Sequence, residues 1–388
     1  MDLTGVLNGL FDREPALRQP KVARRVLDDL RKGQPPSHGI LALTPNAARI
    51  EQRLSSMLAA KGASWQPNGG STSPVNAFIR GRPGQGKTHV LRYADAAQQR
   101  FGAAVSWLET NTVKGRLDRA NEWIPIILEN LRVPLNKDRV AFRSALVSWS
   151  ERAERNQLKS WARQHRRVAA HREFAEDLLD FLTHDDEYAL GRLVGEGIPR
   201  SQPLEYQHRA LGRLAAAADL LVSLGIPRLV LLMDQLETME RRVRDIRSRV
   251  KVYGYWHEPF SKSLPSAFIL WSVVPDQFTV LKRDLLEGRL EDYLDRDYVA
   301  EFIEQFRADP WPSAEVDAVS EKERFDHACA LVAVFLHGHG LTKDRDALAL
   351  TRRDKELRAI LSEFYDQDPT MRFTTMGMIE FLHNQFAD

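Results

Sequence analysis

The octapeptide Gly81-Arg82-Pro83-Gly84-Gln85-Gly86-Lys87-Thr88 constrains this chain more than any other stretch, because it matches G-x-x-x-x-G-K-[ST] at every position. A largely apolar run at residues 74–80 predicts a buried strand before it, and residues 89–97 predict a helix after it. A strand, a glycine-rich turn and a helix in this order are typical of a phosphate-binding loop. The alternative is a glycine-rich turn before an ordinary helix.

The residues of this loop have separate expected roles. The glycines let successive backbone N–H groups point at a phosphate, and the helix N-terminus adds its positive dipole end. Lys87 brings a cation to the phosphate oxygens, and the Thr88 hydroxyl can ligate Mg²⁺. The sequence therefore predicts ATP and Mg²⁺ as ligands, with nucleotide contacts from Gly81, Arg82, Pro83, Gly84, Gln85, Gly86, Lys87, Thr88 and His89.

A second strand ends in a carboxylate. Residues 229–233 are an unbroken apolar run, and Asp234 follows them directly. Ligands of open α/β sheets gather at the carboxyl ends of the strands, so this pattern predicts a Walker B element in which Asp234 and Thr88 hold Mg²⁺. A carboxylate that ends a strand by chance is the competing interpretation.

The residue after Asp234 is unusual for such a site. Many ATPases with this pattern place a glutamate there to polarise the attacking water, whereas this chain has Gln235, whose amide cannot accept a proton. Three explanations stay open. The enzyme is naturally slow or holds ATP, Glu237 takes over the role, or a glutamate has been changed to glutamine so that ATP stays bound.

Composition limits which partners, cross-links and locations are possible for this chain. Lys and Arg total 55 and Asp and Glu total 53, a net charge of +2, so binding of nucleic acid requires local basic patches. The single cysteine, Cys329, excludes an intramolecular disulfide framework and a cysteine-based zinc site, and its apolar neighbours predict a buried thiol. No apolar run reaches the length of a membrane span, and the first residues lack a signal peptide's basic segment. We expect a cytoplasmic protein.

The elements in order predict an α/β fold, a P-loop NTPase with a parallel five-stranded sheet and helices on both faces. We expect a helical segment at 1–70, the ATPase core at 71–305 with a helical insertion at about 112–205, and a helical lid at 306–388. Further strands are predicted at 104–108, 267–274 and 297–303. At the tip of the strand at 267–274, Ser272 or Asp276 is a candidate contact for the γ-phosphate, and a surface turn is equally consistent. Residues 39–50 are a candidate adenine pocket.

Two basic stretches could contact DNA. Both combine cations with aromatic or imidazole rings, which suits a phosphate backbone and its bases, although charged helix faces are usually only solvated. The first, at residues 152–172, holds Arg152, Arg155, Lys159, Arg163, Arg166, Arg167 and Arg172 with Trp161, His165 and His171 between them. The second, at 241–251, holds Arg241, Arg242, Arg244, Arg247, Arg249 and Lys251, followed by Tyr253, Tyr255 and Trp256.

The order of these motifs resembles that of AAA+ ATPases, in particular the origin-recognition, initiator-like branch and the related STAND group. The resemblance covers most of the chain, and the phosphate loop and Walker B element are its specific parts. The helix expected at 46–54 is similar to one that precedes the first strand in that branch. Residues 23–33, 234–238 and 275–276 also look like ATP-binding proteins of BREX-type phage-defence loci. The long helical insertion and Gln235 depart from the pattern.

This resemblance implies residue roles and partners. It implies that Arg289 acts from a neighbouring subunit on the transition-state charge, with Lys87, Asp234, Gln235 and Glu237 as the other catalytic candidates, and that Arg372 of the lid contacts the γ-phosphate. It further implies a homo-oligomer, a ring or filament, that uses ATP to assemble or remodel on DNA, with other defence proteins as further partners and no membrane. The alternatives are an ATP-gated signalling or scaffold protein with little hydrolysis, and a regulator of DNA transposition or replication.

Overall fold

The computed structural model describes most of the chain, namely residues 2–34, 36, 38–60, 63–65, 74–82, 85–113, 118–136, 138–197, 204–236, 238, 242–252, 264, 266–274, 283–284, 286–290, 313–316, 319–344, 354–367 and 370–386. It divides into two compact units. The helical unit comprises residues 1–53, 81–97 and 315–388, and the sheet unit comprises residues 54–80 and 98–314. The domain limits expected from the sequence, 1–70, 71–305 and 306–388, do not coincide with these two units. They stay a prediction.

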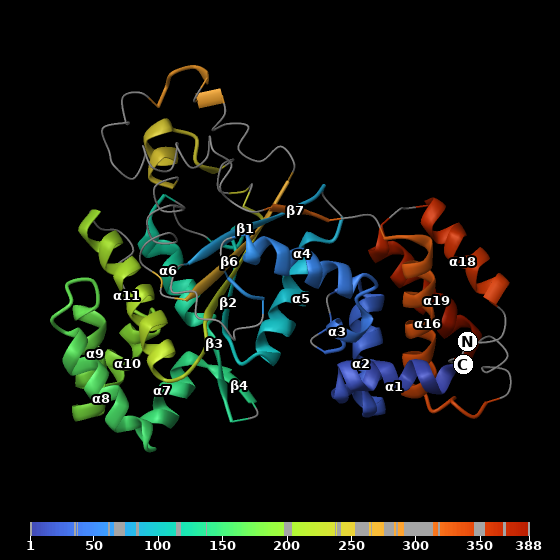
Figure 1. The fold of residues 1–388 in the computed structure, drawn as a ribbon, viewed down its shortest axis with the longest axis horizontal. Coiled ribbons are helices and arrows are strands. Elements are labelled where there is room, and N and C mark those ends of the chain that lie inside the picture. Colours follow the sequence, from blue (N-terminus) through green and yellow to red (C-terminus); the bar gives the residue numbers. More distant parts are fainter. Residues whose placement is uncertain are drawn as a thin grey trace. The chain divides into compact units, whose positions relative to one another are not determined.

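The sheet unit is built on a mixed sheet with the strand order β4-β3-β2-β5-β6-β1-β7 (Figure 1). Its centre is parallel: β2 pairs with β5, β5 with β6, and β6 with β1. Beyond β2 the pairing is antiparallel, from β2 to β3 and from β3 to β4. The strands are β1 Val75–Arg80, β2 Ala104–Glu109, β3 Arg132–Leu135, β4 Asp138–Ala141, β5 Leu229–Asp234, β6 Ala267–Val273 and β7 Ser313–Glu315.

The α/β class is confirmed, but the prediction of a five-stranded parallel sheet is wrong. The added strands β3 and β4 form a hairpin inside the region expected to be mostly helical, with Asn136 at φ 58° in its turn. Val133, Leu135 and Val140 alternate with polar or proline positions over only four residues per strand. So short an alternation is easily missed inside a helical region. The strand expected at 297–303 lies outside the described residues.

Helices of the expected insertion complete the sheet unit. They are α6 Ala120–Glu129, α7 Phe142–Ser150, α8 Glu154–His165, α9 Arg172–His184, α10 Glu187–Leu193 and α11 Leu204–Ser223. One continuous core joins them to the strands, with Trp123, Phe142 and Phe174 fully buried in it. Inside this helical region, Arg213 on α11 forms an ion pair with Asp177 on α9 at 2.7 Å, and both side chains are 9% exposed.

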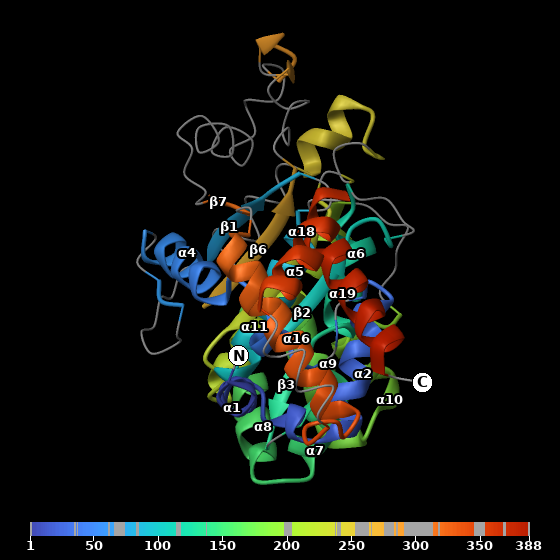
Figure 2. The ribbon, with the colours of Figure 1, turned by 90° about the vertical axis from the view of Figure 1, so that its right-hand side faces the viewer.

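The helical unit has its own core around α16 Glu321–Gly338, which begins with a capping box of Ser320 and Glu323. Helices α2 and α19, from opposite ends of the sequence, pack against α16 (Figure 2). Cys329 is buried in this core, as expected. The further helices are α1 Leu3–Arg13, the 3-10 turn Pro15–Arg18, α2 Pro20–Arg31, α3 Ile40–Leu43, α18 Asp354–Gln367 and α19 Met371–Phe386; α4 Ala47–Ala59 and α5 Lys87–Arg100 cross the division.

A glycine follows the end of helix α2. Helix α2 stops at Arg31, and Gly33 follows with φ +66° while its N–H donates to the Leu30 carbonyl. A left-handed residue after the last turn is a common way to end a helix, and glycine adopts it without strain.

None of the described helices is long and apolar enough to cross a membrane.

Candidate functional site

The octapeptide lies between β1, which ends at Arg80, and α5, which begins at Lys87. Gly86 has φ +93°, a conformation that a residue with a side chain adopts only with strain. At Gly81, an added Cβ would come within 3.2 Å of the Gln85 Oε1 atom and 3.3 Å of the Lys87 Cγ atom. Gly86 is therefore favoured by its backbone conformation, and a side chain at Gly81 would have to shift Gln85 and Lys87. Pro83 and Gly84 lie outside the described residues.

The Lys87 ammonium folds back over the loop that precedes it. Its Nζ donates to the carbonyls of Gly81 at 2.8 Å and Arg82 at 3.2 Å. The Gln85 side chain closes the same turn, because its Oε1 accepts from the Arg82 N–H at 2.5 Å. The loop thus holds a half-buried cation on backbone dipoles at the start of a helix, where the macrodipole also favours an anion.

His89, in the first turn of α5, is tied to the helical unit. Its Nε2 lies 2.9 Å from the Thr44 Oγ1 atom, which itself donates to the Ile40 carbonyl at 2.6 Å. Thr44 therefore accepts from His89, and the ring carries its proton on Nε2. Burial lowers the pKa of His89 to about 4, which keeps it neutral at pH 7. The predicted nucleotide contacts of His89 and of residues 39–50 stay predictions, and the contact found here is structural.

The carboxyl ends of three adjacent parallel strands carry a second polar cluster, which we call the Asp234 cluster: Asp234, Thr110 and Ser272. Asp234 ends β5 and is 2% exposed. Its carboxylate accepts a short hydrogen bond from the Ser272 hydroxyl of β6, and its carbonyl accepts from the Thr110 hydroxyl at 3.1 Å. Thr110 follows β2, whose Glu109 is the register partner of Asp234. Asp234 is thus held from both neighbouring strands, through its carboxylate by Ser272 and through its backbone carbonyl by Thr110.

This cluster gives Ser272 a contact that the sequence did not predict, and its expected contact with the γ-phosphate stays a prediction. Ser272 is fully buried beside Asp234, so its contact is to that carboxylate. Asp276, the other candidate, lies outside the described residues. Thr110 had no signal in the sequence, because its contact depends on the register of β2 with β5.

Gln235 has an unusual backbone. Its φ is +60°, a left-handed conformation that costs a residue with a Cβ about 1–2 kcal/mol. Its N–H donates to the Asp234 Oδ1 atom at 2.9 Å and to the Ser272 Oγ atom at 3.0 Å, and its carbonyl accepts from Thr110 at 2.5 Å. The strand therefore turns sharply directly after the carboxylate. Glu237 lies outside the described residues.

The two arginines expected to contact phosphate lie in protein contacts. Arg289 is about half exposed and pairs with Glu287 at 2.7 Å. In the helical unit, the Arg372 guanidinium covers Gly33 so closely that a Cβ there would lie 2.5 Å from its Nε atom. Their predicted roles toward ATP stay predictions.

The second basic stretch is only partly available to DNA. Arg249 is buried and pairs with the fully buried Asp284 at 2.7 Å. Arg242 donates to the carbonyls of Val113 at 2.7 Å and Thr110 at 3.3 Å. Both make internal contacts, although Arg242 is exposed, as are Arg244 and Arg247; Arg241 lies outside the described residues. The run of charge does not form one continuous DNA-binding face.

The first basic stretch has its rings turned inward. Trp161 of α8 is buried, and it stacks on His165 with ring centroids 4.3 Å apart. These rings therefore cannot stack on bases as the sequence suggested. On the other side of α8, cations line a hollow bordered by Asn156, Lys159, Ser160, Arg163, Gln164 and Arg167.

Comparison of the chain with protein-family models, with curated proteins and with solved structures found no match.

Proposed function

We propose that this chain is an ATP-binding protein that hydrolyses ATP slowly. The observation that carries the proposal is the octapeptide in its context, a strand, a glycine-dependent turn and a helix, with the Lys87 ammonium held on the carbonyls of Gly81 and Arg82. Phosphate oxygens can take the place of carbonyls as acceptors for Lys87 without rearrangement of the fold. A P-loop ATPase of the AAA+ type is the class that this combination supports best.

In this proposal each residue has one task. Lys87 and the loop amides bind the phosphates, and the hydroxyl of Thr88 and the carboxylate of Asp234 supply oxygen ligands, which Mg²⁺ prefers. When bound, Mg²⁺ neutralises charge on the phosphate oxygens. Gln235 can orient a water but cannot take its proton, so the proposal includes slow turnover. Arg289 from a neighbouring copy and Arg372 are the proposed cations for the γ-phosphate.

A second candidate is a nucleotide-gated switch or scaffold that barely hydrolyses ATP, and Gln235 is the residue that favours it. Phosphate release at saturating ATP separates the two: a rate that depends on Mg²⁺ and on Asp234 supports the ATPase. A rate equal to that without protein supports the switch.

The central test is ATP affinity by calorimetry. Lys87→Ala should weaken binding about 10- to 150-fold, because a charged hydrogen bond contributes roughly 1.5–3 kcal/mol. Lys322→Ala, on an exposed position of α16, is the matched control and should bind like the wild type. Equal affinities for the wild type and Lys87→Ala would exclude the phosphate role of the loop.

The proposed work of the protein is ATP-driven assembly or remodelling on DNA, in bacterial phage defence. Its support is narrower: the resemblance in the sequence and the cations along the hollow of α8. Replacing Lys159, Arg163 and Arg167 by Gln should lower DNA affinity and flatten its salt dependence, by about one log–log unit per lost phosphate contact. Arg244→Gln with Arg247→Gln tests the second stretch in the same titration. If neither set changes the slope, the chain acts on a protein partner.

A further inference from the structure

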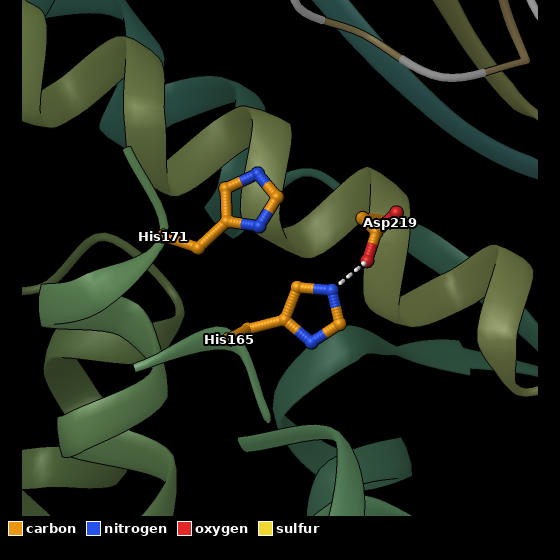
Figure 3. Close-up of side chains that lie close together, drawn as sticks. All are labelled: His165, His171 and Asp219. Carbon is orange, nitrogen blue, oxygen red and sulfur yellow. Dashed lines mark ion pairs between the residues drawn. The ribbon is translucent and has the colours of Figure 1, made fainter. Parts of the chain in front are cut away.

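Two histidines and one carboxylate, none of them among the residues assigned to ATP, converge in the helical part of the sheet unit. His165 ends α8, His171 caps the start of α9, and Asp219 lies on α11. One ligand atom of each lies within 4.8 Å of those of the other two (Figure 3). Two imidazoles and a carboxylate are the ligand set of many zinc sites that keep one position open for water.

Trp161 holds His165 and Asp219 in orientations that suit metal ligands. The Nδ1 atom of His165 lies 2.9 Å from the Trp161 carbonyl, and its Nε2 lies 3.0 Å from the Asp219 Oδ2 atom. The indole N–H of Trp161 donates to the same Oδ2 at 2.8 Å. A histidine ligand usually donates its second ring N–H to a carbonyl or carboxylate, which fixes the tautomer and leaves the other nitrogen for the metal.

His171 supplies an independent indication. Its Nδ1 atom is buried and makes no hydrogen bond within the described part of the chain. Buried polar atoms are nearly always satisfied, so each exception calls for a missing partner. Figure 3 shows the His171 ring turned toward His165 and Asp219, where an ion would provide that partner.

We propose that His165, His171 and Asp219 bind one Zn²⁺ ion that links α8, the start of α9 and α11. Neighbouring ligands of a tetrahedral zinc lie about 3.3 Å apart, given bonds of about 2.0–2.1 Å. The separation of up to 4.8 Å therefore closes by rotation of a histidine ring when the ion binds. The ion replaces the contact between His165 and Asp219 with two metal bonds, and its role is to hold these three segments together.

The test is Zn²⁺ binding to the full chain after chelator treatment, without nucleotide, by competition with a chromophoric chelator. The wild type should bind about one equivalent at this site. Asp219→Asn keeps an acceptor for Trp161 but loses the negative charge. Asp219→Asn and His171→Gln, each made separately, should weaken Zn²⁺ binding by at least about 100-fold. His184→Gln, exposed in the last turn of α9, is the control, and Asp234→Asn removes any contribution of the proposed Mg²⁺ site.

Stability and a spectroscopic probe complete the test. Zn²⁺ should raise the Tm of the wild type and of His184→Gln but not of Asp219→Asn or His171→Gln. Wild-type protein with one equivalent of Co²⁺ should show the intense visible bands of tetrahedral coordination. Because this measurement uses only the wild type, it tests the site even if a variant does not fold. Absence of those bands, or Zn²⁺ affinity unchanged in both ligand variants, would overturn the proposal and leave the trio as a hydrogen-bonded packing cluster.

Discussion

The loop of residues 81–88 and the Asp234 cluster are constructed in opposite ways. In the loop, a half-buried cation rests on two backbone carbonyls and the turn depends on glycines. In the cluster, the carboxylate of Asp234, which is 2% exposed, accepts from the Ser272 hydroxyl and the Gln235 N–H, and its backbone carbonyl accepts from the Thr110 hydroxyl. A ligand can replace carbonyl contacts at little cost, whereas removal of a buried acceptor leaves its donors unsatisfied. Substitutions in the loop should therefore affect mainly binding, and those in the cluster should affect stability as well.

The largest expected effect concerns turnover at the turn after Asp234. Gln235→Glu should raise ATP hydrolysis about 10²–10⁴-fold, the usual contribution of a general base. Gln235→Ala, which also lacks a base, should show no gain. Phosphate release at saturating MgATP measures all three proteins. If Gln235→Glu leaves the rate unchanged while Glu237→Gln lowers it, Glu237 is the residue that positions the water.

The second prediction tests the contrast itself through the free energy of unfolding in urea. Asp234→Ala should lose about 1–3 kcal/mol, because the Ser272 hydroxyl and the Gln235 N–H lose a buried acceptor. Lys87→Ala should change stability by less than about 0.5 kcal/mol, because the side chain is partly exposed and water can replace its ammonium at the carbonyls of Gly81 and Arg82. Comparable losses in both variants would mean that the loop, too, is held by its side chains.

The third prediction concerns pH and the unit that carries the loop. His327 of α16 contacts the Leu43 carbonyl through Nδ1 and the Thr375 hydroxyl through Nε2, and burial lowers its pKa to about 4 from 6.5. Below pH 6.5 the unfolded chain binds this proton and the folded chain does not, so stability falls as pH decreases toward 4. From pH 7 to pH 5 the loss attributable to His327 should be about 2 kcal/mol.

The measurement is urea unfolding at both pH values. His327→Gln should reduce the difference between pH 7 and pH 5, whereas the exposed His184→Gln should leave it as in the wild type. An undiminished pH dependence in His327→Gln would show that the group responsible lies elsewhere, with His89 as the next residue to change.

The sequence predicted the elements that bear a strong local pattern. Strand β5 was expected with its observed limits, because residues 229–233 are uniformly apolar and Asp234 ends the run. The hairpin of β3 and β4 was missed because Pro134 argues against a central strand and each strand is only four residues long.

The contacts of the candidate site were less accessible to prediction. That Ser272 and Thr110 both bind Asp234 depends on strand order and register, which no local pattern encodes. Likewise, the sequence predicted that His165 and His171 belong to a DNA-binding stretch. In the structure, His165 contacts Trp161 and Asp219 because of the way the helices pack. Pairing between distant segments decides both sites.

The smallest effect isolates the backbone of Gln235. At φ +60° a residue with a Cβ is unfavourable, so Gln235→Gly should be more stable than Gln235→Ala by about 1 kcal/mol. This difference is the cost of the left-handed conformation in alanine minus the entropy that glycine loses when the chain folds. Both variants lack the amide, so their difference in urea reports the backbone alone. If the alanine variant is equally stable, the chain adopts φ below zero at this residue, and the N–H contacts to Asp234 and Ser272 are then lost in solution. If the glycine variant is the more stable, the strained turn is retained, and the Asp234 cluster carries a conformational cost that the loop of residues 81–88 avoids through Gly86.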